Sequence, residues 1–205
     1  HLDITASVNN ALKARVYGNY SLFSQALDLN YTAATSDLSN LGIAIKDDIS
    51  LKGKVVGELS NFIADGSGKI VGSNLRFAAR IKDFAPLEIK LDAKSLNLAQ
   101  ITAIALGKPY ITGNMNIQAD ITSKDTLYSG TASLNIPKAI TNNELIATDY
   151  GINLPNNFTI KADSNLNLEG RTAKAKSIIT TPIAVAAALN SIYNIDENVL
   201  NSDLN

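Results

Sequence analysis

Residues 87–122 of the chain read LEIKLDAKSLNLAQITAIALGKPYITGNMNIQADIT. In the first part, the apolar residues Leu87, Ile89 and Leu91 are each followed by a charged residue. This period of two is typical of a strand with one apolar and one charged face. Apolar residues then recur mostly every three or four positions, which predicts a short helix with Asn97 as its cap and Gly107 at its end. Alternation resumes at Ile111, so the stretch predicts a unit of strand, short helix and strand.

The same unit occurs sixty residues earlier without a gap in the alignment. Leu27 corresponds to Leu87, and Gly53 corresponds to Gly113. Chance supplies single apolar matches easily, but it rarely keeps a strand, a cap, a helix and a glycine in one register. The sequence therefore predicts repeats of about 60 residues, with units at 27–86 and 87–136 and a helix at 37–43 in the first unit.

The sequence also predicts further strands and four local features. Asp65-Gly66-Ser67-Gly68 has the composition of a hairpin turn. Residues 137–157 break the alternation and predict an irregular insertion with one short strand near Leu145-Ile146. Residues 180–194 predict a longer helix, because Pro182 suits a first turn and apolar residues follow it. The polar tail beyond Ile195 predicts loose chain.

Composition excludes several classes of function. The 205 residues carry a net charge of −1, with lysines spread singly along the predicted strands, so the chain has no basic footprint for nucleic acid or for an anionic membrane surface. It has no cysteine, and its one histidine is residue 1, so catalytic triads, histidine clusters and thiolate metal sites are not expected. The glycine-rich run at 64–73 fails the spacing of both phosphate-binding motifs. Paired carboxylates remain as a possible acid–base arrangement, but Asp47-Asp48 and Asp196-Glu197 have the character of solvated loops, so we expect neither an enzyme nor a cofactor.

The one-sided apolar strands are the remaining functional signal. Aromatic residues make up 6% of the chain and tryptophan is absent, so the apolar surface is mainly aliphatic. A sheet with one large apolar face folds on itself, pairs with a partner or holds an apolar ligand. We expect a lipid-binding groove with this lining: Val55, Leu59, Leu75, Phe77, Ile81, Leu87, Ile89, Leu91, Met115, Ile117 and Ile121. In the alternative, the same residues form a closed core, and the chain is a structural or adhesive β-repeat module that binds a protein or a glycan.

The run LDAKSLNLAQITAIALGKPYITGNMNIQADI resembles the repeat of the bacterial AsmA-like superfamily, the AsmA/TamB/YhdP-type periplasmic repeat proteins. The family's recurring form is an amphipathic strand, a short "leucine-aspartate-leucine" helix and a "G-x-leucine" strand, and it corresponds here to 93–121 and more loosely to 33–59. The resemblance is clearest from about residue 27 to residue 136, and elsewhere it rests on rhythm alone.

The resemblance implies a mainly β fold with short helices, in which one long curved antiparallel sheet forms a taco-like groove. The whole chain, 1–205, would be a single domain and a fragment of a longer protein, anchored in the inner membrane by a segment outside this sequence. It would lie in the periplasm of a Gram-negative bacterium. There it would carry phospholipid or another acyl-chain lipid for outer-membrane biogenesis, with envelope proteins as possible partners.

Overall fold

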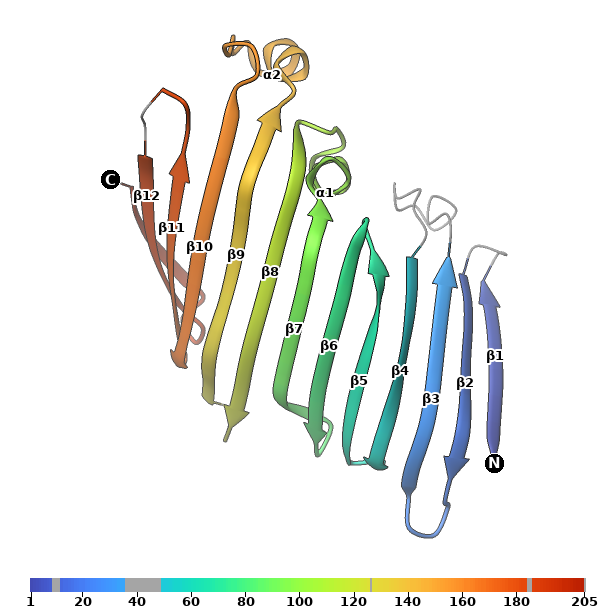
Figure 1. Ribbon diagram of the computed structural model, residues 1–205. Coiled ribbons are helices and arrows are strands. Elements are labelled where there is room, and N and C mark those ends of the chain that lie inside the picture. The colour runs from blue at the N-terminus through green and yellow to red at the C-terminus, as the bar shows by residue number, and fades with distance from the viewer. Residues whose placement is uncertain (9–11, 36–48, 126, 184–185, 205) are drawn as a thin grey trace.

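The computed structural model describes residues 1–8, 12–35, 49–125, 127–183 and 186–204. Within these ranges the chain forms thirteen strands and two short helices (Figure 1). In chain order they are β1 (Leu2–Val8), β2 (Leu12–Tyr20), β3 (Ala26–Thr35), β4 (Ile49–Glu58), β5 (Asn61–Ile70), β6 (Ser73–Lys82), β7 (Ala85–Asn97), α1 (Leu98–Leu106), β8 (Ile111–Lys124), β9 (Leu127–Thr141), α2 (Asn143–Tyr150), β10 (Thr159–Gly170), β11 (Thr172–Thr180), β12 (Ala186–Asn194) and β13 (Val199–Leu204).

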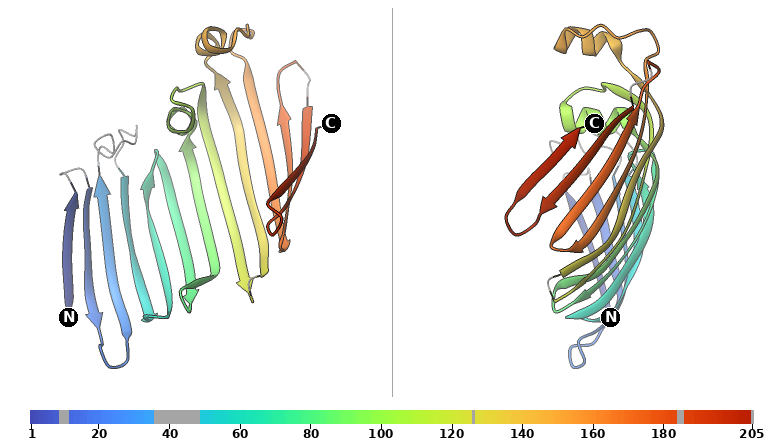
Figure 2. Two further views of the ribbon diagram at one scale, coloured as in Figure 1. Left: turned by 180° about the vertical axis from the view of Figure 1, so that it is seen from behind. Right: turned by 90° about the vertical axis from the view of Figure 1, so that its left-hand side faces the viewer.

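All of these strands belong to one antiparallel sheet in which spatial order equals chain order, β1 to β13. The sheet is open, because β1 and β13 lie at its two edges and do not pair with each other. Seen edge-on in Figure 2, the sheet is curved, and both helices project from its concave side. The predicted mainly β class, with short helices and an antiparallel sheet, is confirmed.

The predicted hairpin at Asp65-Gly66-Ser67-Gly68 is wrong, because these residues lie inside β5. Gly66 pairs with Gly53 on one side and with Phe77 on the other. The turn comes later, at Val71-Gly72, where both residues have positive φ (51° and 70°), as a tight two-residue hairpin requires. The glycines of β5 serve close approach of neighbouring groups instead of a turn.

The predicted irregular insertion at 137–157 is also wrong over most of its length. Strand β9 continues through Pro137, which lies where the register shifts against both β8 and β10. A proline is tolerated inside a sheet at such a bulge, because it has no N–H to donate to the ladder. The residues after β9 form α2, where a short strand was predicted. Asn142 caps α2 by accepting a hydrogen bond from the Leu145 N–H, and Gly151 ends it in a left-handed conformation.

The predicted helix at 180–194 is wrong, because Ala186–Asn194 form strand β12. Alternate residues of β12 pair with β11 on one face: Ala187, Leu189, Ser191 and Tyr193. Pairing with a strand already in place outweighs the helix propensity of the alanines. The predicted loose tail is wrong as well, since Val199–Leu204 add a further strand, β13. The helix predicted at 37–43 lies outside the described residues.

Neither α1 nor α2, the two helices of the described ranges, is long and apolar enough to cross a membrane.

Candidate functional site: an apolar groove on the concave face

The register of the sheet sorts the side chains onto two faces. Residues opposite each other in an antiparallel pair point to the same side of the sheet, so a face can be followed from strand to strand. One such line, which we call the central row, crosses eleven consecutive strands: Val16, Tyr31, Gly53, Gly66, Phe77, Leu91, Ala119, Ala132, Leu166, Ala175 and Ser191. None of these residues is charged. The parallel rows on either side carry further aliphatic residues, so this is the apolar face.

The apolar face is the concave one. Helix α1 packs onto this face, because Leu98 belongs to the same buried cluster as Ala93, Leu96 and Met115. Figure 2 shows α1 on the concave side of the sheet. The curvature therefore turns the apolar face inward and leaves the opposite face outward.

Helix α1 closes one end of the concave face. Asn97 Oδ1 accepts hydrogen bonds from the N–H groups of Ala99 and Gln100 at 2.9 and 3.2 Å, and this cap starts the helix directly at the end of β7. Gly107 ends it with φ of 79°, a left-handed conformation that glycine adopts cheaply. The helix covers only the end of the strands. In the described part of the chain just eight apolar side chains are buried, and six of them form the cluster around α1.

Beyond α1 the concave face is hollowed. A cavity of about 1060 Å³ extends from β6 to β12 and is centred on the central row between Phe77 and Ser191. Its floor is low because four of the seven residues of the central row here are small: Ala119, Ala132, Ala175 and Ser191 lie among Phe77, Leu91 and Leu166. We call this hollow the groove. Its volume is slightly above the range usual for ligand sites, roughly 300–1000 Å³.

A second hollow of about 580 Å³ continues the central row toward β3, on the other side of Phe77. Here the Tyr31 ring lies across Gly53 and Gly66, so that Tyr31 Oη is 2.3 Å from the point where a Cβ of either glycine would stand. The Tyr31 hydroxyl donates to the Asp65 carbonyl oxygen at 3.0 Å. Burial, and to a lesser degree the Asp65 carboxylate, raises the pKa of Tyr31. The two glycines thus provide the space for the hydroxyl end of the Tyr31 side chain.

Most of the residues predicted from sequence to line the groove do lie on the apolar face: Val55, Leu75, Phe77, Ile81, Ile89, Leu91, Met115, Ile117 and Ile121. Of these, Phe77 and Leu91 line the groove itself. Met115 is buried beneath α1 with 8% of its surface exposed, so it is a core residue. Leu59 lies in the β4–β5 turn, and Leu87 lies at the bulge where β6 and β7 change register.

Sequence reasoning missed the small residues and the C-terminal strands that form the rest of the groove: Ala119, Ala132, Leu166, Ala175 and Ser191. The available signal was the strand alternation itself, because every one of them stands at an apolar-face position. Small side chains were passed over since they contribute little apolar area. In a concave sheet, however, small residues make the space that larger ones line.

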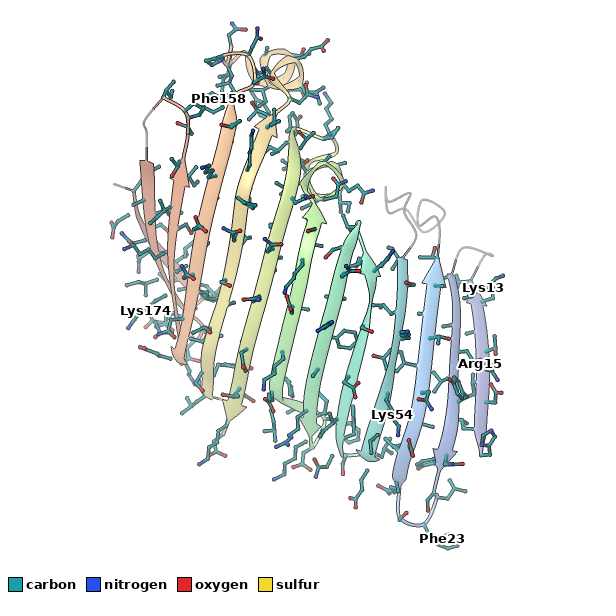
Figure 3. All side chains as sticks on the ribbon, in the orientation of Figure 1. Lys13, Arg15, Phe23, Lys54, Phe158 and Lys174 are labelled. Atoms are coloured by element: carbon teal, nitrogen blue, oxygen red, sulfur yellow. The ribbon has the colours of Figure 1, made fainter. Side chains whose placement is uncertain are left out.

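The convex face carries ion pairs between neighbouring strands. Arg15 donates to both carboxylate oxygens of Asp3, at 2.9 and 2.6 Å, and Lys54 lies 2.8 Å from Asp28; both cations are labelled in Figure 3. Exposed pairs of this kind contribute little to stability, because solvent and salt screen them. Among the residues that the structure describes, no three His, Cys, Asp or Glu side chains gather closely enough to hold a metal ion.

At the end of the strands where β7 and β9 finish, a polar contact joins the segment after α1 to the end of α2. Lys108 Nζ lies 2.7 Å from both carboxylate oxygens of Asp149, and the Tyr110 hydroxyl donates to Asp149 Oδ2 at 2.6 Å. The Tyr110 and Tyr150 rings pack with their centroids 5.5 Å apart. The hydrogen bond from Lys108, followed by that from Tyr110, lowers the pKa of Asp149. Asp149 is thus the group that fixes α2.

This contact predicts a pH dependence for α2. Because the pKa of Asp149 is lower in the folded state, its stabilising effect is complete above the unfolded value of about 3.9 and is lost as pH falls through the folded value. We expect the backbone amide NMR shifts of Asn143–Tyr150 to move as pH falls below about 4. Asp149→Asn should give the low-pH shifts already at neutral pH. Glu144→Gln, which removes a carboxylate at the other end of α2, is the control and should preserve the transition.

In comparisons with known proteins, no family model, curated protein or solved structure matches this chain.

Proposed function

We propose that this chain is a non-enzymatic lipid-binding segment that holds an acyl chain in the groove. The observation that carries the proposal is the hollow on the concave face, which has the uncharged central row along its middle and which the two helices leave uncovered over β6 to β12. Leaving so much apolar surface open to water is unfavourable, and an apolar ligand removes that cost. The resemblance to AsmA-like repeats supports the same function. From the same resemblance we propose a periplasmic location and an anchor in the inner membrane through a segment outside this sequence.

The dimensions of the groove suit an acyl chain. The central row crosses seven strands from β6 to β12, a width of about 29 Å at roughly 4.8 Å per strand interval. An acyl chain spans half of the hydrocarbon core of a bilayer, which is about 15 Å. One chain therefore lies within the row with room to spare. Each methylene transferred from water contributes about 0.8 kcal/mol before the cost of ordering the chain is subtracted.

Such a site needs no specific polar anchor. The groove is open along its length, so a phospholipid head group stays in water while its chains lie on the alanine floor. Binding by apolar contact alone also predicts tolerance toward different head groups. A role in phospholipid transport or outer-membrane biogenesis, with envelope proteins as partners, follows from this kind of binding and from the resemblance.

Native mass spectrometry of the purified chain, followed by lipid extraction, tests the proposal. We expect phospholipid to co-purify, and we expect Ile89→Asp together with Ile117→Asp to abolish it while circular dichroism still shows the sheet. Both residues stand on the apolar face, paired with Ile121 and Leu134. The matched control is Ile63→Asp, on the convex face of β5 with 45% of its surface exposed, which should leave bound lipid unchanged.

A protein that carries no lipid and takes up no fluorescent fatty acid would contradict the proposal. The chain would then be better explained as a structural or adhesive β-repeat that binds a protein or a glycan.

A further inference from the structure

One end of the sheet carries a row of exposed apolar residues at the tips of consecutive hairpins. In an antiparallel meander every second connection falls at the same end. At this end the first four of the six connections between described strands, β2–β3, β4–β5, β6–β7 and β8–β9, present in their turns or at the first strand residue after them what we call the hairpin rim: Leu22, Phe23, Leu59, Phe84 and Leu127. Phe23 is fully exposed and projects beyond the tip of its hairpin in Figure 3. Two of the five phenylalanines of the chain thus lie in the rim.

The backbone conformation at Phe84 disfavours a bulky side chain, so the turn itself does not require a phenylalanine. Asp83 and Phe84 both have positive φ, 51° and 61°, which is the geometry of a type I′ turn. Glycine or asparagine adopts this conformation at low cost, whereas a bulky residue is strained in it. Phe84 also has 73% of its surface exposed, so packing within the chain does not offset the strain. A contact outside the chain is the remaining reason for a phenylalanine at this position.

The first three turns of the rim are fixed to one another by their backbones. The Leu59 N–H donates to the Gln25 carbonyl oxygen at 3.0 Å, and the Asp83 N–H donates to the Ser60 carbonyl oxygen at 2.6 Å. The β2–β3 turn is itself closed by a 3.0 Å bond from the Ser21 N–H to the Ala26 carbonyl oxygen. The apolar tips are therefore held in a row, and little ordering is required when they bind.

The spacing of the tips favours a fluid apolar partner over a protein surface. Successive hairpins are two strands apart, about 9.6 Å, and Ser21, Ser24 and Ser60 lie in the turns between the apolar side chains. A protein interface is built around a contiguous, closely packed apolar centre. The boundary between head groups and acyl chains of a bilayer accepts each tip separately, and apolar residues of peripheral proteins bind there.

The net charge of the four hairpins indicates which kind of bilayer the rim suits. These four hairpins carry two lysines, Lys82 and Lys124, and three carboxylates, Glu58, Asp83 and Asp125, for a net charge of −1. A rim with this net charge is not attracted electrostatically to an anionic membrane surface. It suits a zwitterionic one, where the lysine stems lie along the apolar layer and their ammonium groups reach the phosphates.

We infer that the hairpin rim inserts into the head-group boundary of a zwitterionic phospholipid bilayer and stands the sheet on the membrane with its strands pointing away from it. This inference goes beyond the proposed function, because the rim and the groove use different residues.

Tryptophan fluorescence tests the inference directly, since the chain contains no tryptophan. With vesicles of phosphatidylcholine, Phe23→Trp should shift its emission to shorter wavelength and be quenched by lipids brominated on the acyl chain near the head group. The control is Ile152→Trp, in the loop after α2 at the opposite end of the sheet, where the native side chain is 52% exposed. Its emission should not change. Equal shifts for both variants, or no shift for Phe23→Trp, would overturn the inference.

Phe84→Gly separates a contact role from a structural one. Because glycine suits the turn, we expect the thermal unfolding midpoint of this variant to stay or to rise. Loss of one inserted phenylalanine should weaken the partition to the same vesicles roughly tenfold, whereas Ile152→Ser should not weaken it. A lower midpoint with unchanged partition would show that Phe84 serves the fold. Self-association that depends on Phe84, measured by light scattering, would also overturn the inference in favour of a protein contact.

Discussion

Replacing Gly68 by valine is expected to destabilise the sheet by about 4 kcal/mol or more, at the upper end of single-residue effects. A Cβ at this position would lie 1.8 Å from the Ser50 carbonyl oxygen, 2.8 Å from the Ser50 carbonyl carbon and 2.9 Å from the Leu51 Cα. All three atoms belong to the backbone of β4, so no side-chain rotation relieves the overlap. Strands β4 and β5 must move apart, and the hydrogen bonds between them weaken together.

Urea denaturation followed by circular dichroism measures this effect. Ala64→Val is the matched control, because Ala64 stands on the same strand and the same face but pairs with Val55 and Ala79 without such an overlap. It should change the free energy of unfolding by less than about 1 kcal/mol. Gly66→Ala should fall between the two, since the nearest obstacle there is the movable Tyr31 hydroxyl at 2.3 Å. A Gly68→Val protein as stable as the parent would contradict the packing described for β4 and β5.

Ala132→Phe is expected to abolish acyl-chain binding while leaving the fold intact. Ala132 stands in the middle of the groove floor, between Ala119 and Leu166 of the neighbouring strands. A phenyl ring there fills the space that a ligand occupies, and it does so without overpacking, because the hollow is open. A loss of at least tenfold in affinity corresponds to about 1.4 kcal/mol, less than the contribution of two displaced methylenes.

Titration with a fluorescent fatty acid measures this loss. The control is Ala188→Phe, because Ala188 pairs with Ile178 on the convex face of the sheet and should not affect binding. Unchanged affinity for Ala132→Phe would place the ligand outside the groove. Equal losses for both variants would mean that the phenyl ring disturbs the sheet as a whole.

Most of the strands could be predicted from the alternation of apolar and polar residues in the sequence. Where Leu87, Ile89 and Leu91 alternate with charges, the structure has a strand with the predicted face, apart from the bulge at Leu87. The cap at Asn97 and the stop at Gly107 also mark the real ends of α1. Local patterns suffice in these cases because each element is specified by its own residues and by its nearest neighbours in the chain.

The errors arose where one local preference competed with pairing. The alanines before Leu189 favour a helix in isolation, but β11 offers a paired edge that only the assembled sheet reveals. Gly66 and Gly68 have the composition of a turn, and their role beneath Tyr31 and against Ser50 depends on the register of three other strands. The depth of the groove could not be predicted either, because it depends on which small residues from distant segments become neighbours.

The identity of spatial order and chain order has a consequence for how this protein forms and varies. Every strand pairs only with the strands before and after it in the chain, so the contacts are local and each hairpin can add to one already formed, without waiting for distant segments to meet. The same arrangement makes length an adjustable property. Duplication or loss of one hairpin would shift the following strands by two positions in the sheet and keep every side chain on its own face. The groove would become longer or shorter while the fold stayed the same.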